Sequence, residues 1–466
     1  MAPHRSGSGS GGAGAPPRTY RPRHPERTDL YRILETCFEA YQYVHSERFE
    51  PDAGPLRSVV RTAVPAYLDC GRLFGGFARI RCPRCRAEHL LAFSCRMRNL
   101  CPSCQSKRSQ VFALWLTDEV LLDVPHVHVV FTIPKRLRGL IERERRLHGV
   151  MARAAFETLR IALTGAASEP EAVPGAVVAL QTFGSFGANF HPHLHVIATD
   201  GVFTRDGRFH PVVWPSESDL CERFRKTYLL HLERAERLRP ETRARLLAWQ
   251  HSGFSVKTTQ RIAAAERQRL ERLARYATRV VVAVGAVKRA GPGRVHIETP
   301  RDPRTGQTIL DLDELEFVHA VCQQIPDRRL HLVRYYGAYA SRNRRSLRAA
   351  RDALAVGEPS TPCVDGPERA SRAEGPPAFE NATSLEPALP GSAEAVRRQA
   401  WARLIRRVFE VDPMMCLRCK IAMEVVALIT EPAVIDKILR HSKAHGLTSP
   451  FEANPPRAPP DDPPDA

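Results

Sequence analysis

Three histidines stand two residues apart in the run His191-Pro192-His193-Leu194-His195. Alternate side chains of a β-strand project from the same face, so His193 and His195 would present their imidazoles side by side. Two neutral imidazoles at this spacing can hold a divalent metal ion and leave positions open for a substrate oxygen. His191 shares their face and could be a third ligand, but Pro192 places it at the start of the strand. The alternative is a pair of histidines buried in the core.

A second pair with the same spacing, His126 and His128, opens a run of β-branched residues that ends at Pro134. Such a run is typical of a strand. We interpret these two histidines as residues of a core strand rather than as metal ligands.

A tyrosine hydroxyl is a nucleophile for phosphorus, and Tyr276 is the best candidate among the tyrosines. It lies near the end of an arginine-rich predicted helix, between Arg275 and Arg279. Attack by its hydroxyl would give a phosphotyrosine that keeps the energy of the ester, while the arginines would hold DNA and stabilise the charge. The simpler alternative is a ring packed on the inner face of the helix. The rival candidates are Tyr335, Tyr336 and Tyr339.

Two C-x-x-C pairs lie close together, and their spacing is that of a zinc ribbon. We predict a closed, tetrahedral, structural Zn²⁺ site with Cys82, Cys85, Cys101 and Cys104 as ligands. Cys70 and Cys95 are either spare ligands or core residues, and we favour the core for each. A third pair, Cys416 and Cys419, is a weaker zinc candidate because a complete site there would need distant ligands.

The charge of the chain favours a polyanionic partner. Lys and Arg number 69 against 51 Asp and Glu, a formal net charge of +18, which predicts salt-dependent attraction to nucleic acid. Lys107 and Arg108, beside the cysteine cluster, are candidate phosphate contacts. The sequence shows no membrane-spanning run and no signal peptide, so we expect a bacterial cytoplasmic, nucleoid-associated protein whose cysteines bind metal rather than form disulfides.

The elements that must position these residues alternate in type along the chain. Helical patterns are predicted at 29–69, 105–122, 137–163, 217–246, 258–278 and 313–325, and strands at 126–133, 177–183, 193–198, 280–284 and 295–297. The pattern predicts an α+β fold. The predicted segments are a disordered basic arm (1–28), a zinc-binding, DNA-contacting domain (29–115), a nuclease domain (116–350), a disordered linker (351–396), a small C-terminal domain (397–450) and a disordered tail (451–466).

These pieces occur in an order that resembles the rolling-circle transposases of the insertion sequence 91 family, within the HUH endonuclease superfamily. The segments that carry this resemblance are Cys82–Cys104, His126–Lys135, Gln181–Phe203, Leu273–Arg279, Arg334–Gly337 and Asp412–Cys419. The resemblance implies an HUH-type antiparallel sheet flanked by helices, an N-terminal zinc-ribbon-like module and a small C-terminal domain.

The resemblance also implies the activity. His193 and His195 match the family's pair of ligands for a catalytic Mg²⁺ or Mn²⁺, and Tyr276 matches its catalytic tyrosine. The implied reaction nicks single-stranded DNA at element ends through a 5′-phosphotyrosine and then transfers the strand. The implied partners are single-stranded and duplex DNA at element ends and target, with no membrane, and a homo-oligomer is left open.

Two departures distinguish this chain from its relatives. Some relatives carry a second tyrosine four residues before the first, where this chain has Arg272, so it resembles the single-tyrosine branch. The family's usual Pro-Pro after the catalytic helix is replaced by Val280-Val281. The alternative functions are a non-catalytic zinc-ribbon DNA-binding protein and an HUH replication-initiation nuclease.

Overall fold

The computed structural model describes residues 24–356 and 415–444, apart from positions 168, 170, 185–188, 282, 303–304 and 417. These residues form two compact units, neither of which is continuous in the sequence. One unit holds residues 25–70 and 94–356, and the other joins residues 71–93 to the described C-terminal segment. The units cut across the predicted domain boundaries. Residues 1–23 of the predicted arm, the predicted linker from 357 onward and the predicted tail lie outside the described residues.

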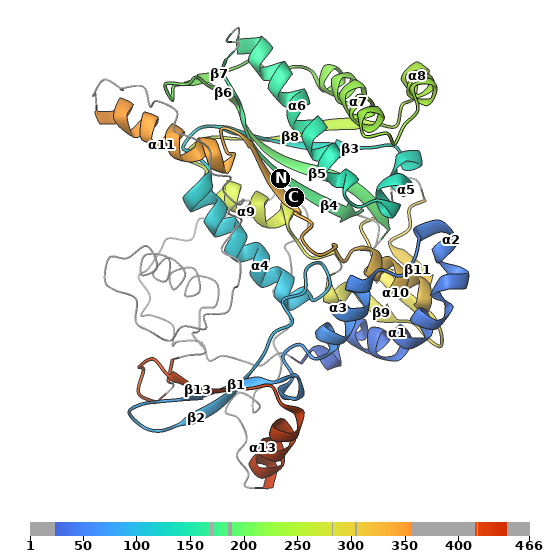
Figure 1. Cartoon of the computed structure of the whole chain (residues 1–466), viewed down its shortest axis with the longest axis vertical. Helices are drawn as coiled ribbons and strands as arrows, with labels where there is room; N and C mark the ends of the chain where they lie inside the picture. The colour runs from blue at the N-terminus through green and yellow to red at the C-terminus, as the bar shows by residue number, and fades with distance from the viewer. Residues whose placement is uncertain are drawn as a thin grey trace, which may run out of the picture. The chain divides into compact units, whose positions relative to one another are not determined.

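A five-stranded antiparallel sheet forms the centre of the larger unit (Figure 1). Its strand order is β12 (Val333–Gly337), β4 (Gly175–Phe183), β5 (Phe190–Thr199), β3 (His126–Thr132) and β8 (Ser255–Ile262). Every neighbouring pair is antiparallel. The three central strands are those predicted from the β-branched runs. This sheet, with helices on both faces, confirms the predicted α+β class.

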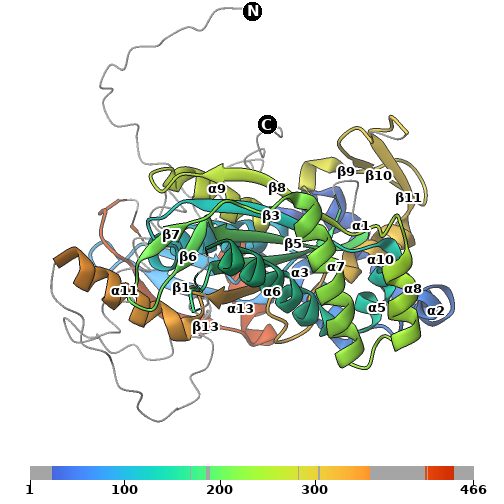
Figure 2. The same cartoon turned by 90° about the horizontal axis from the view of Figure 1, so that it is seen from above.

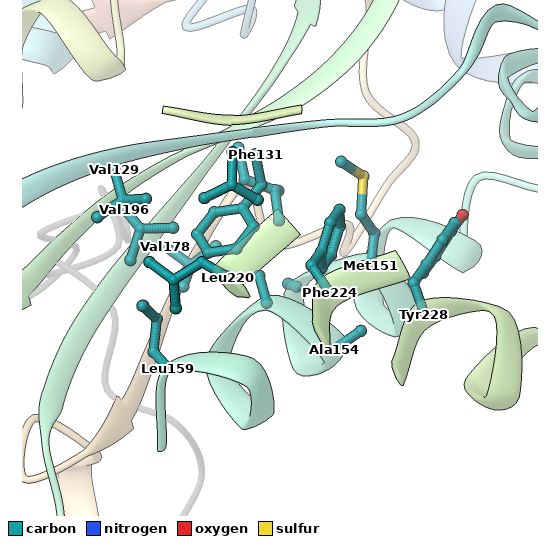
Figure 3. Close-up of a cluster of buried hydrophobic side chains, with 14 of the residues drawn as sticks. Val129, Phe131, Met151, Ala154, Leu159, Val178, Val196, Leu220, Phe224 and Tyr228 are labelled. Carbon is teal, nitrogen blue, oxygen red and sulfur yellow. The ribbon is translucent and has the colours of Figure 1, made fainter. Parts of the chain in front are cut away.

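One face of the sheet packs against α6 (Leu147–Ala167) and α7 (Glu217–Arg234). Even-numbered residues of β5, among them Leu194 and Val196, point into this core. Figure 3 shows Val196 with Phe131 of β3 and Phe224 of α7 in the same apolar layer. The alternation of apolar residues therefore fixes which face of β5 is buried here.

The opposite face of the sheet packs against α4 (Pro102–Trp115), the π-helical turn η3 (Leu116–Val120) and α9 (Arg267–Ala277). Figure 2 shows α9 and α6 on opposite sides of the sheet. Ile197 of β5 packs with Leu273 and Ala274 of α9. His193 and His195 are in phase with Ile197, so they project from this second face, toward α9.

A second core in the same unit joins the N-terminal helices to a late part of the chain. It comprises α1 (Asp29–Arg48), α3 (Ser58–Leu68), α10 (Glu314–Gln323) and a three-stranded sheet of β9 (Val287–Arg289), β10 (Arg294–Glu298) and β11 (Ile309–Asp313). Asp313 caps α10 through its side chain, and Glu316 completes a capping box.

The remaining described elements of this unit lie outside the sheets and helices named so far. They are η1 (Pro25–Arg27), α2 (Glu50–Ala53), α5 (Lys135–Arg143), β6 (Gly201–Phe203), β7 (Phe209–Pro211), α8 (Pro240–Ala248), η4 (Val284–Ala286) and α11 (Ser341–Val356). None of the described helices is long and apolar enough to cross a membrane.

The smaller unit is built around a sheet in the order β13 (Glu424–Ile429), β1 (Phe77–Arg81) and β2 (Glu88–Ala92), with both pairings antiparallel. It also contains η2 (Leu73–Gly75) and α13 (Pro432–Ala444). The middle strand thus pairs with a hairpin partner and with a strand from the far end of the sequence.

Two predicted elements are wrong. The helix predicted at 258–278 is divided into β8 and α9, because Val256, Thr258 and Gln260 pair with β3 instead of continuing a helix. The strand predicted at 280–284 is absent from its described residues, since Val281 packs against the α1–α10 core and Val284 begins a 3₁₀ turn.

Candidate active site

Two histidines of β5, His193 and His195, have their Nε2 atoms 3.2 Å apart. Two nitrogens bound to one ion at about 2.1 Å lie about 3.0 to 3.4 Å apart, so the pair is spaced for a shared metal. His193 Nδ1 lies 2.8 Å from the His191 carbonyl oxygen and donates its proton there, which leaves the lone pair on Nε2. His195 is 4% exposed, and the His193 ring is partly buried.

His128 of β3 holds the other nitrogen of His195. Its Nε2 lies 3.0 Å from His195 Nδ1, and the two rings are stacked with centroids 5.2 Å apart. His128 Nδ1 in turn lies 2.6 Å from the Thr259 hydroxyl oxygen of β8. If His195 donates to His128 and His128 donates to Thr259, both Nε2 atoms of the β5 pair keep lone pairs for a metal.

The protonation states of these rings suit metal binding. Burial lowers the pKa of His193, and burial together with neighbouring imidazoles and Arg279 lowers the pKa of His195 well below its ordinary value. Burial also lowers the pKa of His128 to about 4. Neutral imidazole is the form that ligates metal.

Tyr276 lies beside this pair. Its ring meets the His195 ring edge-on, with centroids 5.3 Å apart and an interplanar angle of 89°. The tyrosine is 39% exposed, so its hydroxyl is open to a substrate from solvent. It is therefore not simply a ring buried on the inner face of α9.

Two arginines flank the tyrosine. The Arg279 guanidinium lies 4.7 Å from the Tyr276 ring centroid and 5.6 Å from that of Phe183. Among the described residues its buried Nε has no hydrogen-bond partner. Arg275 is exposed on α9. Both cations can reach a phosphate held near the tyrosine.

A third donor toward a metal is offered by Gln181 of β4, directly opposite His193 in the strand register. Its Nε2 donates to the Tyr276 carbonyl oxygen at 2.9 Å. Its Oε1 is buried and has no hydrogen-bond partner among the described residues, which fits a metal ligand. Sequence reasoning missed Gln181, although its position on the neighbouring strand was a usable signal.

His191 remains a second candidate for the third position. Its Nε2 is also buried without a partner in the described part of the chain, and burial lowers its pKa to about 4. The ring nitrogens of His191, His193 and His195 do not all lie within 4.8 Å of one another.

The rival tyrosines lie elsewhere. Tyr339 is fully buried and its hydroxyl bonds to His126 Nε2 at 2.6 Å. Tyr335 packs edge-on against Trp115, and Tyr336 stacks on Phe156. Burial raises the pKa of all three hydroxyls. The structure brings Tyr276, and none of these, to the histidine pair.

The cysteines form two groups of four whose members differ from those of the predicted zinc ribbon. Cys101 and Cys104 gather with Cys70 and Cys95, whereas Cys82 and Cys85 gather with Cys416 and Cys419. The predicted set of Cys82, Cys85, Cys101 and Cys104 is therefore wrong. Cys70 is buried in the core as interpreted, and Cys95 packs against that core, but both also lie among the candidate metal ligands. Spacing along the chain reveals each pair but not the partner pair that folding brings to it.

The group formed by Cys70, Cys95, Cys101 and Cys104 lies at the start of α4. Cys104 Sγ lies 3.7 Å from Cys70 Sγ and 3.6 Å from Cys95 Sγ. Four thiolates in contact are a natural Zn²⁺ site, and the N-terminus of a helix favours negative charge. Lys107 and Arg108 follow on the same helix, where Arg108 donates to the Arg96 carbonyl oxygen at 3.2 Å.

Helix α4 connects this cysteine group to the helix that carries the tyrosine. Gln105 Nε2 donates to the Thr278 carbonyl oxygen at 2.7 Å, and Ser109 Oγ donates to the Arg275 carbonyl oxygen at 2.8 Å. The last turn of α9 is thus fixed to a helix that begins at the candidate zinc site.

Comparisons with known proteins find transposases. Residues 38–133 match a family described as "Transposase zinc-binding domain", and residues 175–346 match one described as "Putative transposase". A protein of Sinorhizobium fredii (strain NBRC 101917 / NGR234), named "Putative transposase y4qJ", is 27% identical over 369 residues, covering 74% of this chain and 88% of the relative. The "Transposase for insertion sequence element IS801" of Pseudomonas savastanoi pv. phaseolicola is 27% identical over 317 residues, covering 62% and 73%. No solved structure matches.

The fold, the cysteine-rich module and these matches define a transposase, an enzyme that acts on DNA. The chain is similar to transposases of the insertion sequence 91 type.

Proposed function

We propose that this transposase nicks single-stranded DNA at the ends of its element through Tyr276 and rejoins the strand in rolling-circle transposition. The observation that carries the proposal is the edge-on contact between the Tyr276 ring and His195, whose Nε2 lies 3.2 Å from that of His193. A candidate nucleophile that is exposed to solvent thus adjoins a pair of imidazole nitrogens that could hold a metal.

The chemistry exchanges one phosphoester bond for another, so the number of such bonds does not change. The Tyr276 oxygen forms a bond to phosphorus while the bond to the 3′ oxygen breaks, giving a 5′-phosphotyrosine and a 3′-hydroxyl. The phenol proton leaves and the 3′ oxygen gains a proton. Attack by a 3′-hydroxyl on the phosphotyrosine reverses the step and joins the strand.

The surrounding residues hold the reacting groups. His193 and His195, with Gln181 or His191 as a third donor, would hold Mg²⁺ or Mn²⁺, which supplies charge stabilisation to the scissile phosphate. His128 and Thr259 keep His195 in the tautomer that leaves Nε2 free. Arg275 and Arg279 bind the phosphate from the tyrosine side. Because Arg272 stands four residues before Tyr276, each active site has one tyrosine. The second strand end then either takes part through its free 3′-hydroxyl or is bound by another copy of the chain.

The first experiment incubates purified protein and Mn²⁺ with labelled single-stranded DNA from the element's ends. We expect a slow, protease-sensitive band on a denaturing gel from the wild type and from Tyr335→Phe, a control at a buried tyrosine. Tyr276→Phe should give no band and bind DNA near normally, because it loses only the hydroxyl.

A band of undiminished yield from Tyr276→Phe would remove this residue from its role. No band from any variant, with DNA binding intact, would favour a binding protein. An adduct without strand joining would favour a replication-initiation nuclease.

A further inference from the structure

A second set of four cysteines lies in the smaller unit. Cys82 and Cys85 lie around the start of the turn between β1 and β2, and Cys416 and Cys419 precede β13. All four Sγ atoms lie within 4.8 Å of one another, and Cys85 Sγ lies 3.6 Å from Cys416 Sγ. The matched zinc-binding family ends at residue 133, so it does not include the second pair.

The two pairs adopt the same local backbone structure. In the first pair, the Arg86 N–H donates to the Cys82 carbonyl oxygen at 3.0 Å, and the Cys82 N–H donates to the Ala87 carbonyl oxygen at 2.9 Å. In the second pair, the corresponding bonds run from Lys420 to Cys416 at 2.8 Å and from Cys416 to Ile421 at 2.9 Å. Two segments more than three hundred residues apart therefore fold into one kind of knuckle.

The sulfur atoms repeat the same pattern. The Cys85 N–H points at Cys82 Sγ at 3.5 Å, and the Cys419 N–H points at Cys416 Sγ at 3.4 Å. An N–H aimed at sulfur stabilises a thiolate more than a thiol, because the thiolate carries the negative charge. Each knuckle thus stabilises the thiolate form of its first cysteine, Cys82 or Cys416.

Both knuckles also carry the same backbone strain. Arg86 has φ of +60° and Lys420 has φ of +56°, a left-handed conformation that disfavours side chains other than glycine. Side chains this exposed gain little packing in return. A metal that closes each turn through two sulfurs would offset the strain.

The apolar cluster around these cysteines is small among the described residues of this unit. It consists of Ala78, Ile80, Cys82, Cys416 and Met423, with a few partly buried neighbours, and Phe77 and Ile435 are buried outside it. Val426 and Leu428 of β13 remain 43% and 63% exposed. A core of this size needs an additional constraint, and a structural metal is a common one in small modules.

We propose that Cys82, Cys85, Cys416 and Cys419 bind a second Zn²⁺ ion, separate from the ion of Cys70, Cys95, Cys101 and Cys104. Binding converts thiols to thiolates and releases their protons to solvent. The ion joins the β1–β2 hairpin to β13, so the zinc module near the N-terminus is completed by the C-terminal segment. A tetrahedral site with four sulfur ligands is closed and structural, and it leaves no position for a substrate.

The test is the zinc content of the full-length protein, measured by elemental mass spectrometry. We expect two zinc ions per chain in the wild type. The double variant Cys416→Ser with Cys419→Ser should retain one. Cys221→Ser, a half-buried cysteine outside both groups, should retain two. Two ions in the double variant, or one ion in both it and the wild type, would overturn the proposal.

A second measurement uses the wild type alone, in case the double variant does not fold. Thiol alkylation is followed residue by residue before and after a chelator removes zinc. Cys82, Cys85, Cys416 and Cys419 should be protected together and exposed together, while Cys221 should react equally in both states. Equal reactivity of Cys416 and Cys419 with and without chelator would refute a metal at this site.

Discussion

At the scale of single residues, the histidine pair depends on what lies behind it. His193 is oriented by a carbonyl oxygen, and His195 by the ring of His128, which is oriented by Thr259. A buried imidazole can donate from only one nitrogen when neutral, so each partner decides which nitrogen carries the lone pair. His128 therefore acts through His195 and is a positioning residue.

Removing His128 should weaken the metal site without removing a ligand. We expect His128→Ala to reduce Mn²⁺ affinity about 10- to 100-fold, because a lost outer partner lets the ligand ring rotate. His128→Gln, which keeps a hydrogen-bond acceptor, should recover part of this loss. The measurement is adduct yield against Mn²⁺ concentration.

The matched control is His210→Ala in β7, away from the central sheet. Its adduct yield should depend on Mn²⁺ concentration as that of the wild type does. If His128→Ala also titrates like the wild type while folding normally, His128 is only a core residue.

At the scale of elements, α4 and α9 determine where the tyrosine lies. The bonds from Gln105 and Ser109 reach carbonyl oxygens at the end of α9, where the Arg275 oxygen also accepts from the Thr278 N–H and the Thr278 oxygen lies beyond the last helical residue. The cysteine group at the start of α4 therefore supports Tyr276 through one intervening helix. The candidate zinc site and the candidate active site share a structural element.

Breaking this junction should reduce activity more than DNA binding. We expect Gln105→Ala with Ser109→Ala to lower the free energy of unfolding by about 2 to 6 kcal/mol, because four partly or fully buried hydrogen bonds are lost, two of them to carbonyl oxygens at the end of α9. Adduct formation should slow as α9 loosens. Ser346→Ala on exposed α11 is the control, since its hydroxyl bonds only within its own helix. Unfolding in urea and the rate of adduct formation are measured together; an unchanged adduct rate would show that α4 does not position the tyrosine.

At the scale of the whole molecule, buried histidines make stability depend on pH. Burial lowers the pKa of His126 to about 4 and that of His148 to about 3. Between these values and the ordinary pKa near 6.5, the unfolded chain binds more protons than the folded one. Stability is therefore full above about pH 6.5 and falls as pH decreases toward 4.

His148 offers the clearest test of this pH dependence. Both its ring nitrogens are buried without a hydrogen-bond partner in the described part of the chain. Each such histidine contributes a slope of about 1.4 kcal/mol per pH unit, so His148→Phe should reduce the slope by about that amount. His251→Gln, at an exposed position, is the control. Urea unfolding from pH 4.5 to 7.5 measures the slope, and an unchanged slope in His148→Phe would contradict the assignment.

The central strands and one face of the active site could be predicted from the sequence. A strand pattern has a period of two, so the alternation of Leu194 and Val196 with His193 and His195 determines which side chains share a face. The helix that carries Tyr276 could also be located, although its start was predicted too early. These features depend on neighbours a few residues apart.

Only the tertiary structure determined which distant groups meet. It placed His128 and Gln181 beside the β5 pair, because strands β3 and β4 pair with β5 in a particular register. It also exchanged the partners of the cysteine pairs. Every C-x-x-C pair offers two equivalent sulfurs, so spacing cannot say which pair completes which site; strand pairing and core packing across hundreds of residues decide it.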